Sequence, residues 1–218
     1  MSTPLRFYTH PMSRGRMVRW MLEECQASYE TVVLAYNSSM KSPDYLRLNP
    51  MGKVPALQHG EVVVTETPAI LCYLADLHPQ AQLAPAVGDP ARGSYYRWLF
   101  FVAGPMEAVV TGKALGLLAP PDKAGMLGYG SYDDVLRNVA TALAALSPVS
   151  PYLCGTQFSA ADLYLASQLM WGMQFGTIER QGLFEDYVAR CTARPAFSRA
   201  SLIDEAALAE IKGSSHDV

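Results

Sequence analysis

The sequence predicts two structural parts, a small α/β domain followed by an all-helical domain. In roughly the first 80 residues, short apolar strands alternate with helical patterns in the order β-α-β-(α)-β-β-α. Beyond residue 90, strand patterns nearly vanish and helical patterns follow one another. The segment "HPQAQLAPAVGDP" at 78–90 has three prolines and no sustained period, which is typical of a linker. We therefore expect domains over residues 1–80 and 91–218.

The chain begins with a β-α-β unit. Residues 5–8, "LRFY", form a short apolar strand, and residues 29–34, "YETVVL", form a second one. Residues 14–25 between them show a helical apolar stripe with arginines on the opposite face. This order implies a parallel strand pair joined by a right-handed crossover.

A hairpin and a helix complete the first domain. After a short helix near 43–48, "VPAL" at 54–57 and "EVVVT" at 61–65 read as strands with a connection of hairpin length. The helix at 68–77 places its apolar residues at i, i+3, i+4 and i+7, so one face is buried.

The second domain is predicted to be helical throughout. We expect helices over residues 91–118, 131–146, 159–173, 182–193 and 196–211. The apolar stretch at 98–110 is interrupted by Pro105 and Glu107, so it reads as a buried, kinked helix that is too short to span a bilayer. In "QFSAADLYLA", Ser159 and Asp162 form a predicted capping box at the start of the 159–173 helix.

Composition and charge exclude several classes of protein. Of the 218 residues, 50% are hydrophobic and 17% charged, which is ordinary for a globular protein and unlike a disordered or membrane-embedded chain. The net charge of -3 provides no positive field for nucleic acid. The start "MSTPLRFYTH" has no basic segment followed by an apolar run, so no secretory signal is expected and the predicted location is cytoplasmic.

The cysteines do not suggest a metal site or a disulfide framework. They are widely spaced, with no CxxC pair and no metal-like cluster with histidine, at Cys25, Cys72, Cys154 and Cys191. Cys25 continues the helical apolar stripe that includes Val18, so we expect a core thiol and not a nucleophile. No bound metal is predicted.

Pro55 interrupts an apolar pattern that otherwise predicts a strand. It is compatible either with an edge strand and a trans peptide bond or with a cis Val54–Pro55 bond. A cis bond would turn the backbone of Val54 outward, where its N–H and C=O can pair with an extended, peptide-like ligand.

Two helix starts supply further candidate ligand groups. Thr67 suits the N-cap of the 68–77 helix and Pro68 its first turn, which leaves free amides able to bind a carboxylate, while Glu66 suits an ammonium group. The alternative is a solvated cap beside an incidental acid. Ser13, at the start of the 14–25 helix, can stabilise a ligand thiolate or merely cap its helix.

Together these features resemble the cytosolic glutathione transferases. The segment "NPMGKVPALQHGEVVVTETPAILCYLAD" at 49–76 resembles the family's glutathione-binding segment, and "FSAADL" at 158–163 resembles its capping box and hydrophobic staple. The resemblance covers nearly the whole chain. It implies a thioredoxin-like N-terminal domain and an all-α C-terminal domain, with glutathione as co-substrate.

Carried over residue by residue, the resemblance implies a glutathione site. Val54 would pair its backbone with the cysteinyl part of glutathione, and Pro55 would be cis. Glu66 and Thr67 would hold the γ-glutamyl end, and Lys53 would neutralise the glycyl carboxylate.

The resemblance also implies a thiolate partner and a reaction class. Ser13 would stabilise the thiolate, with Tyr8 and Thr9 as rival hydroxyls at the end of the preceding strand. No cysteine lies between residues 8 and 16, so the chain resembles a bacterial-like serine-type member and not a cysteine-type one. The expected activity is conjugation of glutathione to small, partly apolar electrophiles, as in detoxification.

An electrophile pocket and a homodimer are further expectations. The pocket would lie between the domains, and its candidate residues are Met12, Phe101, Met106, Met126, Tyr129 and Trp171. The same site is compatible with an isomerase, a dehalogenase or a peroxidase. A non-catalytic module that uses the fold to bind partner proteins or apolar ligands is the alternative from a different class.

Overall fold

A computed structural model of the chain describes residues 4–214, and its backbone contacts divide these residues into two compact units. The first unit comprises residues 4–81 together with 194–214, and the second comprises residues 82–193. The expected division into residues 1–80 and 91–218 therefore differs from the structure in two respects. The second unit begins at residue 82 and includes most of the expected linker. The C-terminal helix α9 (Pro195–Ser214) belongs with the first unit and not with the other helices.

The first unit is built on a four-stranded mixed sheet in the order β2-β1-β3-β4. Its strands are β1 (Leu5–Thr9), β2 (Tyr29–Val33), β3 (Ala56–His59) and β4 (Val62–Thr65). β1 and β2 are parallel, whereas β1 and β3, and β3 and β4, are antiparallel. The predicted β-α-β unit and the predicted hairpin are both confirmed.

Side chains alternate across this sheet, so its two faces have separate cores. The helices and short 3-10 segments of the unit are α1 (Gly15–Glu24), η1 (Ser39–Lys41), α2 (Pro43–Leu48), α3 (Thr67–Leu77) and η2 (Pro79–Ala81). α1 and α3 pack against each other and on the sheet, where Phe7 is fully buried. Tyr8 and Ala56 instead cluster with Tyr45 of α2. This is the thioredoxin-like arrangement.

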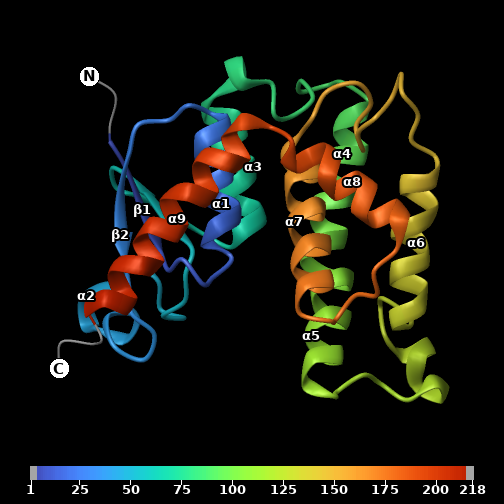
Figure 1. The fold of residues 1–218 in the computed structure, drawn as a ribbon, viewed down its shortest axis with the longest axis horizontal. Helices are drawn as coiled ribbons and strands as arrows, with labels where there is room; N and C mark the ends of the chain where they lie inside the picture. The colour runs from blue at the N-terminus through green and yellow to red at the C-terminus, as the bar shows by residue number, and fades with distance from the viewer. Residues whose placement is uncertain (1–3, 215–218) are drawn as a thin grey trace. The chain divides into compact units, whose positions relative to one another are not determined.

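Helix α9 is held against α1 by a buried ion pair, and Figure 1 shows the two helices together. Arg19 Nε donates to Asp204 Oδ1 at 2.7 Å, and both side chains are 1% exposed. Trp20 packs edge-on against Phe197, with ring centroids 4.9 Å apart. Sequence patterning missed this because the partners are separated by some 180 residues and each residue suits an ordinary amphipathic helix.

The second unit is helical throughout, as predicted. Its elements are α4 (Ala91–Phe101), the π-helical turn η3 (Val102–Met106), α5 (Glu107–Leu115), η4 (Pro121–Met126), α6 (Tyr132–Ala144), α7 (Ala160–Gln174) and α8 (Gly182–Thr192). The expected kink is a π turn that contains Pro105, whose missing N–H interrupts the regular helical ladder. Strand segments are absent from the described part of this unit.

The predicted capping box at the start of α7 is confirmed and extends into a buried network. Asp162 is fully buried, and its carboxylate accepts from Ser159 N at 2.9 Å, Leu153 N at 2.8 Å and the Tyr187 hydroxyl at 2.8 Å. Burial raises the pKa of Asp162, although these donors oppose the shift. The network ties the start of α7 to α8 and to the preceding loop.

Within the part of the chain that the structure describes, one helical stretch is long and apolar enough to cross a bilayer. Residues Ala91–Leu115 form 25 helical residues, and an 18-residue window within them has a mean hydropathy of 1.2. Residues 98–110, taken alone, are too short to span a bilayer, but the helical stretch in the structure extends from residue 91 to residue 115. Core helices of globular domains have the same length and composition, and α4 and its π turn pack on α7 within the unit.

Removing Asp204 should destabilise the first unit strongly. Asp204→Ala leaves Arg19 buried without its carboxylate, so we expect a loss of about 3–5 kcal/mol in the free energy of unfolding. Glu30→Ala is the matched control because its partner Arg6 is half exposed, and it should cost less than about 1 kcal/mol. Urea unfolding measures the free energy of unfolding of both variants. Equal losses would contradict the conclusion that the buried Arg19–Asp204 pair stabilises the first unit.

Candidate functional site

The register of the sheet brings three predicted site segments to one edge. Tyr8 of β1 lies opposite Ala56 of β3, and Ala56 lies opposite Thr65 of β4. The turn after β1, the residues before β3 and the residues after β4 are therefore neighbours. These segments carry Ser13, Val54–Pro55 and Glu66–Thr67 respectively.

The Val54–Pro55 segment presents open backbone groups at this edge. The Val54–Pro55 peptide bond is cis, as the resemblance implied. The Val54 side chain packs against the cluster that contains Tyr8 and Tyr45. Within residues 4–214, the N–H and C=O of Val54 have no hydrogen-bond partner. These groups are therefore free to pair with a ligand.

The loop before Val54 is fixed by side chains of the first unit. The Lys53 carbonyl accepts from the Tyr45 hydroxyl at 2.5 Å and from Asn49 Nδ2 at 2.8 Å. Lys41 Nζ donates to the carbonyls of Met51 and Gly52 at 3.1 and 3.0 Å. Sequence reasoning missed Lys41 because nothing in its pattern shows that it lies against residues 51 and 52. The Lys53 side chain is exposed, so its ammonium group is accessible to an anion.

Helix α3 begins one residue earlier than expected, so the prediction that Thr67 is its N-cap is wrong. Thr67 is the first helical residue, and Glu66 is the N-cap with φ +68°. This left-handed conformation is uncommon for a residue other than glycine. Glu66 is exposed and its side chain does not cap the helix, so amides of the first turn have no side-chain acceptor within the described structure. Such a helix start suits a carboxylate.

Ser13 lies in the turn between β1 and α1 with its hydroxyl hydrogen-bonded on both sides. Ser13 Oγ donates to the His10 carbonyl at 2.6 Å and accepts from Gly15 N at 3.0 Å. The hydroxyl therefore supports the start of α1, as the capping alternative anticipated, although the N-cap position itself belongs to Arg14. To donate to a ligand sulfur, the hydroxyl must exchange its bond to His10.

The two rival hydroxyls have different surroundings. Tyr8 is buried, and its hydroxyl donates to Gln58 Oε1 at 2.9 Å. Thr9 is fully buried, and Thr9 Oγ1 has no partner within the described chain. Ser13 is 8% exposed and is the one of the three that lies in the turn itself.

Close packing between Thr9 and Gly15 restricts this turn. A Cβ atom placed on Gly15 would lie 2.0 Å from Thr9 Oγ1 and 3.0 Å from Ser13 Oγ. No side chain larger than hydrogen fits there unless β1 or α1 shifts. Gly15 thus allows the end of β1 and the start of α1 to approach each other closely.

The six predicted electrophile residues differ widely in exposure. Met12 is 57% exposed and Met126 is 81% exposed, whereas Met106 is fully buried in the π turn and presents no surface. The remaining three are half-buried, namely Phe101, Tyr129 and Trp171. Burial of Met106 agrees with the predicted burial of the 98–110 segment and removes this residue from the candidate pocket.

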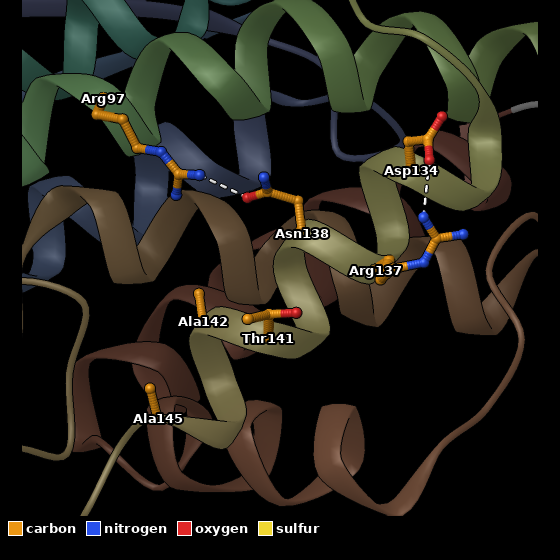
Figure 2. A pocket seen from close by; sticks show the side chains of 7 residues that line it. All are labelled: Arg97, Asp134, Arg137, Asn138, Thr141, Ala142 and Ala145. Atoms are coloured by element: carbon orange, nitrogen blue, oxygen red, sulfur yellow. Dashed lines mark hydrogen bonds and ion pairs between the residues drawn. The ribbon is translucent and has the colours of Figure 1, made fainter.

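The surface grooves of the described residues are lined by residues other than the predicted site residues. Figure 2 shows a groove of about 590 Å³ between α4 and α6. In this groove Arg97 bonds to Asn138, and Arg137 bonds to Asp134. A second groove, of about 540 Å³, is lined by residues of α6, of α8 and of the loop between α6 and α7. Neither is lined by a predicted site residue, and the charged groups in Figure 2 already have partners.

Two of the cysteines have thiols that are poorly suited to nucleophilic chemistry. None of the four cysteines forms a disulfide. Burial raises the pKa of Cys25 to about 12 and that of Cys154 to about 11. Cys25 is 5% exposed, as expected of a core thiol.

Substitution of Gly15 should disturb this site more than substitution of an unhindered helical glycine. Gly15→Ala forces Thr9 or α1 to move, so we expect a loss of about 1–3 kcal/mol in the free energy of unfolding. Gly93→Ala is the matched control because its Cβ would meet nothing within 4 Å. That change should stabilise α4 by up to about 1 kcal/mol. Urea unfolding measures the free energy of unfolding of both variants. If Gly15→Ala leaves it unchanged, the close packing of Gly15 against Thr9 is contradicted.

Comparison with known proteins agrees with this geometry. Residues 3–76 match the family model for the glutathione S-transferase N-terminal domain. The glutathione S-transferase GST-4.5 of Xanthomonas campestris pv. campestris is 32% identical over 186 residues, which covers 82% of this chain and 87% of that protein.

Solved structures show the same arrangement. A glutathione transferase from Methylococcus capsulatus has a TM-score of 0.76 at 28% identity and covers 92% of this chain and 98% of its own. A sphingomonad glutathione S-transferase complexed with glutathione has a TM-score of 0.69 at 27% identity, with the same coverage of both chains. The sheet edge, the cis Val54–Pro55 bond and the relationship to these proteins lead to one conclusion: the chain belongs to the glutathione S-transferase family.

Proposed function

We propose that this protein is a glutathione transferase that adds the thiolate of glutathione to small, partly apolar electrophiles. The observation that carries the proposal is the register Tyr8–Ala56–Thr65, which gathers three kinds of ligand group at one sheet edge. A tripeptide with two carboxylates, an ammonium group and a thiol matches those groups.

Glutathione recognition is assigned to groups that have no other partner within residues 4–214. The N–H and C=O of Val54 pair with the cysteinyl backbone in the manner of an added strand. The start of α3 at Thr67 receives the γ-glutamyl carboxylate, and Glu66 receives the ammonium group. Lys53 neutralises the glycyl carboxylate. The open backbone of Val54 and the exposure of Glu66 and Lys53 support this assignment.

The chemical role is assigned to Ser13. A hydroxyl at the start of α1 favours a thiolate over a thiol, both by hydrogen bonding and through the positive end of the helix. Binding the tripeptide places its sulfur beside an electrophile, and the lowered thiol pKa supplies the nucleophile near neutral pH. Conjugation is favoured over thiol exchange because no cysteine lies in the turn.

Met12 is the electrophile residue best supported by its surroundings. It directly precedes Ser13, and its side chain is 57% exposed. A flexible thioether suits a variety of apolar or aromatic compounds.

Removal of the Ser13 hydroxyl tests the proposed chemistry. Because a hydrogen bond to a charged group contributes about 1.5–3 kcal/mol, we expect Ser13→Ala to lower kcat with an aryl halide about 10- to 100-fold. The affinity for glutathione should change much less, because the other contacts remain. Steady-state kinetics and calorimetric titration with glutathione measure the two effects.

Two results would contradict this assignment. Unchanged turnover in Ser13→Ala would transfer the role to Tyr8 or Thr9. Failure of the unaltered protein to bind immobilised glutathione, together with no turnover, would favour the non-catalytic module. A panel of isomerisable, halogenated and peroxide substrates separates conjugation from the related reactions.

A homodimer is also part of the proposal. Tyr96 and Phe100 lie one helical turn apart on α4, and they are 43% and 73% exposed. Large apolar side chains together on one helix face are typical of an interface.

Phe100→Glu should therefore yield monomers. A charge at a buried aromatic anchor of an interface is expected to raise the dimer dissociation constant at least about 10-fold. Phe175→Glu is the matched control, since Phe175 is 65% exposed but lies outside α4. Sedimentation velocity distinguishes the species, and a dimer that withstands Phe100→Glu would contradict the placement of the interface.

A further inference from the structure

We propose that His10 and Tyr36 are positioning residues that hold the turn carrying Ser13 and so determine where the Ser13 hydroxyl meets the glutathione sulfur. This inference rests on the proposed function and extends the site to two residues that the sequence analysis did not select.

His10 organises the turn through both its ring and its carbonyl. The Met12 N–H donates to His10 Nδ1 at 3.1 Å. The His10 carbonyl accepts from Ser13 N at 3.0 Å and from Ser13 Oγ at 2.6 Å. The ring of His10 therefore holds Met12, and its carbonyl holds the backbone of Ser13. The bond from the Ser13 hydroxyl to this carbonyl is the one that is exchanged when the hydroxyl turns to a ligand sulfur.

Tyr36 holds the same turn from the segment that follows β2. Its hydroxyl donates to the Met12 carbonyl at 3.1 Å, and its ring packs on the His10 ring with centroids 4.3 Å apart. The N–H and the C=O of Met12 are thus bound by the side chains of one aromatic pair. Residues outside regular structure need such partners for their backbone groups.

A third contact secures the other side of the turn. Arg16 Nε, in α1, donates to the Pro11 carbonyl at 2.8 Å. Every residue from Pro11 to Ser13 is therefore held by a hydrogen bond to a named partner. The turn is built as a rigid support, as a group that must meet a sulfur atom requires.

The contact to Met12 depends on a neutral imidazole. Nδ1 accepts a hydrogen bond only when the ring proton is on Nε2. His10 is 8% exposed, and burial lowers its pKa, which favours the neutral form near pH 7. The charged or titratable groups of the surrounding segments are Tyr36, Arg14 and Arg16.

Four variants test the proposal. His10→Leu removes the acceptor, and His10→Asn restores an acceptor near the position of Nδ1. Tyr36→Phe keeps the ring contact and removes the hydroxyl, and Ser13→Ala removes the supported group itself. Each variant is measured for amide exchange at Met12 and, by ultraviolet absorbance of the thiolate, for the pKa of bound glutathione.

The expected results form a pattern that a general loss of stability would not produce. One hydrogen bond contributes about 1 kcal/mol, so His10→Leu should speed exchange of the Met12 amide about fivefold and lower the acid dissociation constant of the bound thiol by a similar factor. Tyr36→Phe should lower that constant to a smaller extent. His10→Asn should stay within about twofold of the unaltered protein on both readouts.

The contradicting outcomes distinguish this inference from the proposed function. If Ser13→Ala raises the pKa of the bound thiol and His10→Leu does not, the positioning role is wrong and the role of Ser13 stands. Failure of His10→Asn to restore either readout also overturns the positioning role. If Ser13→Ala leaves the thiol pKa unchanged, the proposed role of Ser13 fails, and positioning of that hydroxyl toward the sulfur fails with it.

Discussion

The pairing of β1, β3 and β4 is the constraint on which the whole site depends. Because Tyr8, Ala56 and Thr65 lie side by side, the residues just beyond them meet at one edge. A slip of one residue would exchange the two faces of a strand and place Tyr8 against α1 instead of α2. The separate cores on the two faces prevent this slip. The burial that stabilises the sheet is therefore also what assembles the candidate glutathione site, and no additional element is needed to bring its three segments together.

Helix α1 is restrained at its start and near its middle. At the start, Gly15 packs directly against Thr9, so the helix begins at a fixed distance from β1. Near the middle, Arg19 is buried in its ion pair with Asp204 of α9. The C-terminal helix thus belongs physically to the unit that carries the site, although it is last in the chain. Restraint of α1 matters because its N-terminus is the positive helix end nearest Ser13.

Much of the fold follows from local patterns in the sequence. Alternating strands, helical stripes, the capping box at Ser159 and the proline-interrupted helix are each encoded within a few neighbouring residues. The same holds for the candidate ligand segments at Val54–Pro55 and Glu66. What local patterns do not contain is long-range pairing. The Arg19–Asp204 contact joins distant helices, and the support of Met12 by Tyr36 joins two loops across the sheet edge. The start of α3 was also not predicted correctly, because Glu66 adopts a left-handed conformation that its residue type does not favour.

The central claim is that the sheet edge orients glutathione so that its sulfur meets Ser13. The most direct test is a crystal structure of the complex with glutathione. The account predicts the sulfur within about 3.5 Å of Ser13 Oγ and the cysteinyl backbone paired with Val54. A sulfur that instead faces the Tyr8 hydroxyl, or a tripeptide bound away from Val54 and Glu66, would contradict it.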